Sequence, residues 1–148
     1  MSPSLHQQVN EFFESYASAL EKFDTKSMAH HYSMPCTFLS DDTCTVFTDI
    51  SKLEGLFVQG TTFYKQFGIA YSEPEVYSKQ FWTDKTVLTR VVWRYYDSER
   101  NPIYSCDYQY ILRRDKFDIF RIDVSVAINE KERMEAWLSK RKSDKVKG

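Results

Sequence analysis

The chain has 148 residues, and its 20 Lys and Arg residues nearly balance its 21 Asp and Glu residues. This length suits one ordinary domain, and the balanced charge excludes the strong basic field typical of proteins that bind nucleic acid or anionic membranes. We therefore expect a single domain over residues 1–148, with its core over about 5–128, and neither a nucleic-acid nor a membrane partner.

Aromatic residues make up 16% of the chain, whereas Gly and Pro number four each, which favours long regular elements with rings in the interior. The spacing of Cys36, Cys44 and Cys106 fits neither a zinc site nor a CxxC motif, so reduced thiols and no metal or cofactor are expected. The start of the chain has no signal-peptide pattern, and no apolar run approaches the ~18 residues of a membrane span. These features predict a cytoplasmic protein.

Two helices are predicted at the start of the chain. Apolar residues recur at steps of three or four over residues 5–23, which predicts an amphipathic helix, and Ser4 with Gln7 fits a capping box at its start. Asp24 is a good N-cap for a short second helix. We expect that helix to end at Pro35, because the residue before a proline favours an extended conformation.

A small hairpin is predicted next. Residues 36–40 and 43–47 are rich in Thr, Val and Phe, which favours two short strands. The dipeptide Asp41-Asp42 between them suits the turn.

A third helix is predicted over about residues 50–67 from its apolar stripe. Thr48 or Asp49 can cap its start, and Gly68 stands at the position where a glycine commonly ends a helix. Gly60 interrupts the stripe, so a bend is expected near it.

The apolar period changes to two after Tyr71. Four long strands are therefore predicted, at about 71–83, 86–96, 103–113 and 117–128. The short connections between them predict an antiparallel meander. Pro74 would break a central ladder, so we expect the first of these strands at an edge or bulge.

The end of the chain predicts a short helix over 129–139, with Asn129 and Glu132 at its start. The basic residues at 140–148 are expected to form a frayed tail in solvent.

Period two also predicts which side chains share a face of the sheet. On the third long strand, Tyr108 and Tyr110 alternate with Asp107, so an inward apolar face turns Asp107 outward. On the fourth, Phe120 shares a face with the other apolar residues, and Ser125 lies opposite. We expect the charged residues of the outer face to form a cross-strand ladder rather than an anion site.

The order of helix, Asp-capped short helix, hairpin, helix and meander, from about residue 5 to 128, resembles the nuclear transport factor two-like superfamily. Its members include ketosteroid isomerases, scytalone dehydratase and SnoaL-like cyclases. The resemblance implies an α+β, cystatin-like cone, in which N-terminal helices and a short C-terminal helix pack on a curved antiparallel sheet. It also implies a homodimer that forms through the outer sheet face.

The segment from Tyr16 to Asp24 is similar to the end of the first helix of ketosteroid isomerase, where a tyrosine donates to the oxyanion. The resemblance places the base of that family at Ser40, which cannot act as a base unaided, and Asp41 beside it would need a shift in strand register. The second acid of the family corresponds to Asp107. The weak catalytic candidates are therefore Tyr16, Asp41 and Asp107.

Each candidate has a plainer structural interpretation. Tyr16 lies on the apolar stripe of the first helix, where a core tyrosine is as reasonable as a ligand donor. His30 and His31 are adjacent and cannot face one metal from a helix, although a catalytic histidine, as in scytalone dehydratase, is an alternative. The side chains predicted to line a ligand pocket are Tyr16, His31, Phe38, Trp93, Tyr108 and Phe120.

Three functions remain open from the sequence. The first is a protein with a pocket for a small apolar or aromatic metabolite, since such pockets are mostly apolar with few polar groups. The second is an isomerase, dehydratase or cyclase that uses general acid and base catalysis. The third is a dimeric interaction domain without enzymatic activity and with a filled interior.

Overall fold

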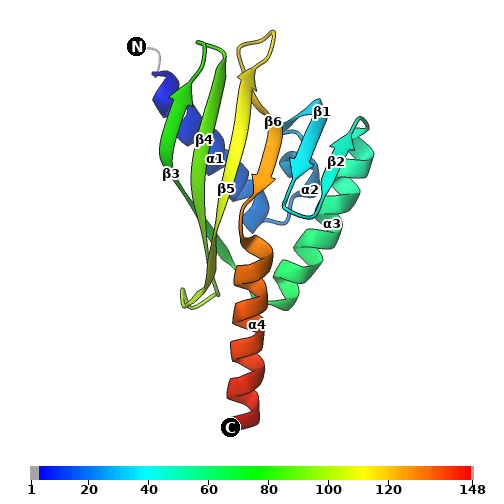
Figure 1. Ribbon diagram of the computed structural model, residues 1–148, viewed down its shortest axis with the longest axis vertical. Helices are drawn as coiled ribbons and strands as arrows, with labels where there is room; N and C mark the ends of the chain where they lie inside the picture. Colours follow the sequence, from blue (N-terminus) through cyan, green and yellow to red (C-terminus); the bar gives the residue numbers. More distant parts are fainter. Residues whose placement is uncertain (1–3, 148) are drawn as a thin grey trace.

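The computed structural model describes residues 4–147, so residues 1–3 and 148 of the predicted domain lie outside the described part. The elements in chain order are α1 (Leu5–Glu21), α2 (Thr25–Ala29), β1 (Tyr32–Leu39), β2 (Cys44–Phe47), α3 (Ile50–Gln66), β3 (Tyr71–Phe81), β4 (Thr86–Tyr96), β5 (Pro102–Arg114), β6 (Phe120–Ala127) and α4 (Glu130–Lys147). The strands form one curved sheet with α1 behind it, and α4 projects beyond one end (Figure 1). The predicted α+β architecture is confirmed.

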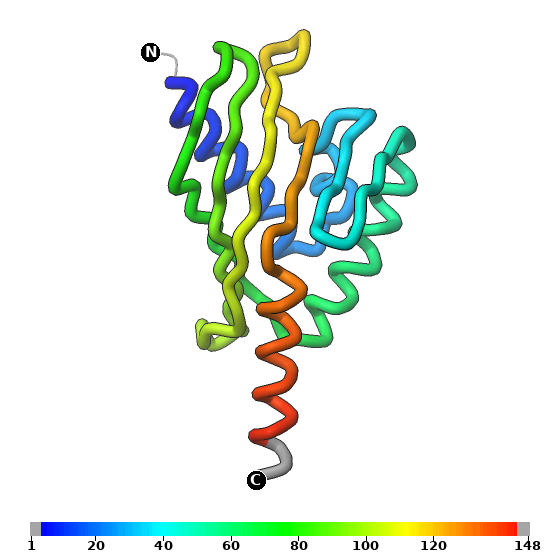
Figure 2. Tube along the Cα trace, in the orientation of Figure 1, coloured from blue at the N-terminus to red at the C-terminus, as the bar shows by residue number. Residues whose placement is uncertain are grey.

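The sheet has the strand order β2-β1-β6-β5-β4-β3. Strands β3 to β6 form the predicted antiparallel meander, and β1 and β2 form the predicted hairpin. Strand β1, however, pairs with β6 in parallel, so the expectation of a wholly antiparallel sheet is wrong at this junction. The chain leaves the hairpin through α3, re-enters at the far edge of the sheet and returns by the meander to β1 (Figure 2).

The helix starts follow the sequence closely. The Ser4 side chain accepts a hydrogen bond from the Gln7 N–H at 3.1 Å, and Asp24 accepts one from the Ser27 N–H at 3.1 Å. Asp49 caps α3 in the same way, through the Ser51 N–H at 2.9 Å. These bonds satisfy amide groups that have no partner inside their own helix.

Helix α3 ends as predicted but does not break. Gly68 has a φ of 77°, the left-handed conformation that glycine adopts without strain just beyond a helix. The helix is continuous through Gly60, so no interruption occurs there.

The second helix is shorter than predicted, because α2 ends at Ala29 and the chain is already extended at Tyr32. The Nδ1 atoms of His30 and His31 bond the carbonyl oxygens of Lys26 and Ser27, at 2.7 and 2.6 Å, and so satisfy the end of the helix. Pro35 lies inside β1, where the register with β6 is irregular and a missing N–H is tolerated.

The last helix is longer than predicted, because α4 continues through the expected tail to Lys147. Its capping also differs from the expectation. The Asn129 side chain turns back to the sheet and bonds Asp107 instead of an amide of α4. No helix in residues 4–147 is both long and apolar enough to cross a bilayer, and the cytoplasmic location stays a prediction.

A bulge in β6 reverses the expected alternation of its side chains. Ile111 pairs with Val124 while Leu112 pairs with Ile122, so Asp123 is an extra residue in the ladder. Phe120 and Ile122 are buried as predicted, but beyond the bulge Ser125 is the buried residue, with only 3% of its surface exposed. The prediction that Ser125 faces outward is therefore wrong.

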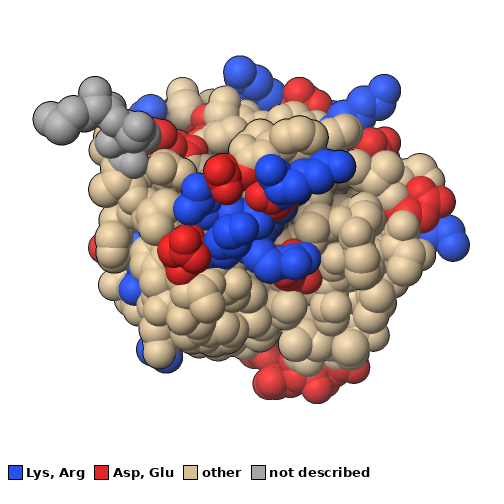
Figure 3. All heavy atoms as spheres, turned by 90° about the horizontal axis from the view of Figure 1, so that it is seen from above, with Lys and Arg blue, Asp and Glu red and all other residues tan. Residues whose placement is uncertain are grey.

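The outer face carries the predicted charge ladder. Arg94 of β4 pairs with Glu75 of β3, and Arg113 of β5 pairs with Asp123 of β6, both at 2.7 Å. Basic and acidic side chains also lie side by side at the end of the molecule that carries the β3–β4 and β5–β6 turns (Figure 3). Exposed pairs of this kind contribute little to stability, ~1 kcal/mol or less each.

Candidate functional site

A cavity of about 400 Å³ lies between the helices and the inner face of the sheet. Pockets that bind small molecules have volumes of this order. Side chains from all four described helices and from β1, β4, β5 and β6 line it. They are Tyr16, Leu20, Met28, Tyr32, Phe38, Leu39, Ser40, Thr43, Leu56, Phe57, Gln59, Gly60, Thr61, Phe63, Tyr64, Trp93, Tyr95, Tyr108, Tyr110, Ser125, Ala127 and Glu130.

One part of the cavity wall carries hydroxyl groups with protons to donate. The Trp93 Nε1–H donates to the Tyr110 hydroxyl oxygen at 2.9 Å, which leaves the Tyr110 proton available for another acceptor. The hydroxyls of Tyr16 and Tyr32 lie 2.9 Å apart and share one hydrogen bond, so one of their two protons is also available. We call the hydroxyls of Tyr16, Tyr32 and Tyr110 the donor group.

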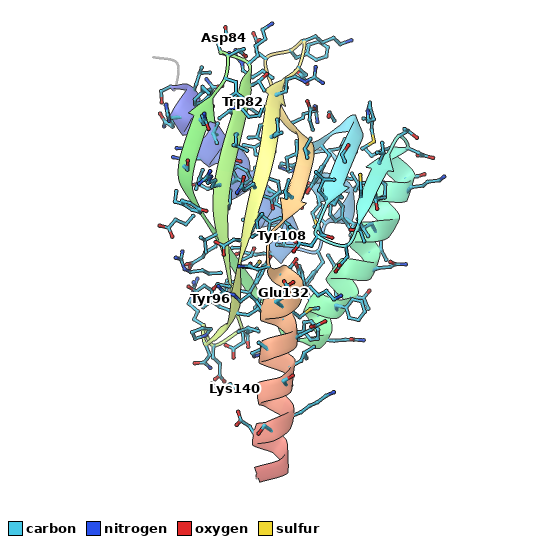
Figure 4. The ribbon with its side chains drawn as sticks, viewed as in Figure 1. Trp82, Asp84, Tyr96, Tyr108, Glu132 and Lys140 are labelled. Atoms are coloured by element: carbon cyan, nitrogen blue, oxygen red, sulfur yellow. The ribbon has the colours of Figure 1, made fainter. Side chains whose placement is uncertain are left out.

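A second part of the cavity wall is built around the carboxylate of Glu130, in the first turn of α4. Its Oε2 accepts hydrogen bonds from the Tyr64 hydroxyl at 2.9 Å and the Tyr104 hydroxyl at 3.0 Å, and its Oε1 accepts a short one from Tyr108. Tyr108 lies beside the start of α4 in Figure 4. The single hydroxyl proton of Tyr64 is already donated to Glu130. In the 3.4 Å contact between the Tyr64 and Tyr95 hydroxyls, Tyr95 is therefore the donor. We call Glu130 with these four tyrosines the acceptor group.

Burial raises the pKa values of the tyrosines in both groups well above the ordinary value of 10.0. Desolvation is the main cause for Tyr16, and its bond to Tyr32 opposes the rise. For Tyr64, Tyr104 and Tyr108, desolvation is again the largest cause, and the negative charge of Glu130 adds to it. These phenols therefore stay neutral hydrogen-bonding groups at neutral pH.

The cysteines are free thiols, as predicted. Desolvation raises the pKa of Cys36 to about 11, and it raises the pKa of Cys106 further, with the charge of Glu130 contributing. A thiol of this kind is a poor nucleophile at neutral pH, because the thiolate is the reactive form.

The structure brings four of the predicted pocket residues together, since Tyr16, Phe38, Trp93 and Tyr108 all line the cavity. His31 does not line it. Its side chain lies in a second hollow beside α1, where Nδ1 bonds the Ser27 carbonyl oxygen and Nε2 lies 3.0 Å from the Ser15 hydroxyl.

The pKa of His31 is lowered mainly by burial. Phe120 is also buried but lines the same second hollow, because it stands at the start of β6, whereas Ser125 and Ala127, which line the cavity, are toward the other end of that strand. The interpretation of His31 and Phe120 as residues of the cone pocket is therefore not supported by the geometry.

The two predicted acids lie outside the cavity lining, although Ser40 lies within it. Asp41 is exposed in the turn between β1 and β2. The Asp107 N–H donates to Asn129 Oδ1, and Asn129 Nδ2 donates to Asp107 Oδ2, both at 2.7 Å. The structure therefore does not bring either predicted carboxylate to Tyr16.

Sequence reasoning missed Glu130, the carboxylate that does reach the cavity. An acid in the first turn of a helix is ordinarily explained by the helix dipole, and Glu132 fits that explanation equally well. The usable signal was the position of Glu130, directly after the strand that neighbours the tyrosine-rich β5.

Comparison with known proteins agrees with this fold. A family model described as NTF2-like protein (DUF6841) matches residues 7–130, and no curated protein matches the chain. Among solved structures, a domain of unknown function with a cystatin-like fold from Nostoc punctiforme is similar, with a TM-score of 0.68 at 12% identity over 88% of this chain and 80% of that chain.

Two further structures show the same likeness. An NTF-2 like protein of unknown function from Shewanella oneidensis has a TM-score of 0.67 at 6% identity, over 84% of this chain and 99% of that chain. A ketosteroid isomerase-like protein from Erwinia carotovora has a TM-score of 0.61 at 9% identity, over 80% of this chain and 91% of that chain. At these identities the likeness shows the shared fold alone.

Proposed function

The chain belongs to the NTF2-like proteins of family DUF6841, and we propose that it binds a small, largely apolar or aromatic metabolite in its cavity. The observation that carries the proposal is the cavity itself, about 400 Å³ in volume and walled mainly by aromatic and aliphatic side chains. Flat rings would stack well here, because Tyr108 and Tyr110 already lie nearly parallel, with an interplanar angle of 10°.

The donor group supports a ligand that presents an oxygen acceptor, such as a carbonyl or hydroxyl, to these hydroxyls. Tyr16 is then a ligand-facing donor, which agrees with the role suggested by the resemblance of its segment. Binding is better supported than general acid and base catalysis, because Asp41 and Asp107 lie outside the cavity lining. A filled interaction domain fits less well with an open cavity of this size.

Filling the cavity should abolish binding. Gly60 of α3 lines the cavity, and a Cβ placed on it would meet nothing within 4 Å, so Gly60→Phe can extend its ring into the space without a backbone clash. We expect ligand affinity to fall by about a hundredfold or more. The measurement is calorimetry, or quenching of tryptophan fluorescence, with a panel of neutral aromatic alcohols and ketones.

Gly55→Phe is the matched control. Gly55 is in the same helix and also has nothing within 4 Å of an added Cβ, but it is exposed and outside the cavity lining. Both substitutions remove a helix-interior glycine and should not lower the helix propensity. Equal ligand binding by the two variants would refute the proposal.

We also propose that the chain forms a homodimer through the outer face of the sheet. Leu88, Ile111 and Val124 stand opposite one another on adjacent strands, so they form an aliphatic row across that face. Sedimentation equilibrium should give twice the chain mass, and Ile111→Lys should shift the mass to that of one chain. A single-chain mass for the unmodified protein at micromolar concentration would contradict this assembly.

A further inference from the structure

The acceptor group presents no proton to a ligand. A phenol hydroxyl has one proton, and Tyr64, Tyr104 and Tyr108 each direct theirs to Glu130. Tyr95 has the Tyr64 oxygen, already a donor to Glu130, and the Cys106 sulfur as acceptors for its own proton. Inside the cavity, these groups can therefore act only as hydrogen-bond acceptors. A ligand must carry a hydrogen-bond donor to bind them.

The charge of the cavity lining also favours a ligand that carries a hydrogen-bond donor. Glu130 is the one charged side chain among the described residues that line the cavity, and no Lys, Arg or His is among them. Oε2 accepts two phenol hydrogen bonds and Oε1 accepts one, with the Cys106 thiol as a further, weak donor to the carboxylate. Because a carboxylate oxygen has about two acceptor positions, Oε1 is the atom a ligand donor would reach. The aromatic walls add the negative faces of their rings, which attract cations.

From these observations we propose that the ligand carries a cationic nitrogen, an amine or ammonium group, that binds at the acceptor group. This inference rests on the proposed function and specifies the chemical class of the ligand. The protonated nitrogen donates to Oε1 of Glu130 and to phenol oxygens, and the apolar body of the ligand extends toward the donor group. An anionic ligand would instead meet an uncompensated carboxylate in a partly desolvated site, which disfavours it.

A series of three probes on one scaffold tests the charge. The probes are 3-phenylpropan-1-amine, 3-phenylpropan-1-ol and 3-phenylpropanoate, which share their ring and chain and differ in the terminal group. We expect the amine, protonated at pH 7.5, to bind the unmodified protein about tenfold or more tightly than the alcohol. The carboxylate should bind most weakly. Calorimetry at low ionic strength measures all three.

Glu130→Gln identifies the residue responsible. It keeps the size of the side chain and removes the charge, so the preference for the amine over the alcohol should fall to about threefold or less. Glu132→Gln is the matched control, because Glu132 is exposed on the same helix and outside the cavity lining (Figure 4). It should keep the full preference.

The outcomes separate this inference from the proposed function. An alcohol that binds the unmodified protein as tightly as the amine overturns the cation assignment and leaves ligand binding intact. An amine preference that survives in Glu130→Gln overturns the role of Glu130. If that variant does not fold, as judged by circular dichroism, the probe series on the unmodified protein decides. Failure of these probes and of every neutral panel member overturns the proposed function itself.

Discussion

Raising the pH above about 10 should unfold the protein over a narrow interval, because buried tyrosines must stay protonated in the folded state. Their pKa values are raised above 10.0, and desolvation by burial is the largest cause in every case. The residues concerned are Tyr16, Tyr32, Tyr64, Tyr95, Tyr104, Tyr108 and Tyr110.

The direction of the effect follows from proton linkage. Above the ordinary tyrosine pKa, the unfolded chain has lost these protons while the folded chain retains them, so the free energy of unfolding falls as the pH rises. The contribution is fully present below about pH 10 and is lost progressively above it. Each group contributes a slope of roughly 1.4 kcal/mol per pH unit, which for the seven tyrosines together approaches ~10 kcal/mol per pH unit. A domain whose free energy of unfolding is about 5–15 kcal/mol would therefore unfold within about one or two pH units above the point where the fall begins.

Urea unfolding at fixed pH values between about 8 and 11.5, followed by circular dichroism, measures the slope. Absorbance of tyrosinate near 295 nm provides a second probe, and most of its increase should coincide with the loss of secondary structure. A free energy of unfolding that stays level through about pH 11.5 would show that these phenols ionise in the folded protein.

Replacing Glu130 with alanine should lower the free energy of unfolding by about 3 kcal/mol or more, since three phenol donors lose their acceptor. Those donors come from α3 and β5, so the carboxylate holds α4 to both. Without it, Tyr104, which is only 9% exposed, would keep a buried hydroxyl with no acceptor at its former position. Denaturant unfolding at pH 7 is the measurement.

Two further variants test whether the lost hydrogen bonds of Glu130 cause the destabilisation. Glu132→Ala removes an exposed carboxylate of the same helix and should change the stability by about 0.5 kcal/mol or less. Tyr64→Phe removes one of the three donors and should cost about 1 kcal/mol. If Glu130→Ala is no more destabilising than Glu132→Ala, the carboxylate does not anchor α4.

Most of the fold was predictable because its signals are local. The caps at Ser4, Asp24 and Asp49 depend on neighbouring residues only, and the meander strands follow from period two. The early end of α2 was not predictable, because it depends on two histidines that turn back to carbonyl oxygens while Pro35 is accommodated in a strand. The parallel pairing of β1 with β6 is likewise a property of the closed sheet.

Which side chains face the cavity could be predicted where a strand or helix keeps a regular apolar period. Tyr16, Trp93 and Tyr108 line the cavity because unbroken alternation or helical spacing carries them there. The bulge at Asp123 reverses which side chains of β6 face inward beyond it. One inserted residue does not change the composition of a strand, so the sequence gives no sign of it. Glu130 reaches the cavity only because α4 begins beside β5, which no local pattern specifies.

The parallel pairing of β1 and β6 also bears on how the chain folds during synthesis. The hairpin of β1 and β2 is translated first, but β6, the neighbour that fixes it in the sheet, is translated only after α3 and strands β3 to β5. Contacts between such distant segments form slowly, since a long loop must close before they contribute. We therefore expect the aromatic residues of the N-terminal half to stay partly exposed to solvent until β6 has been translated. Exposed apolar surface of this kind promotes aggregation, so chaperones would matter most at that stage.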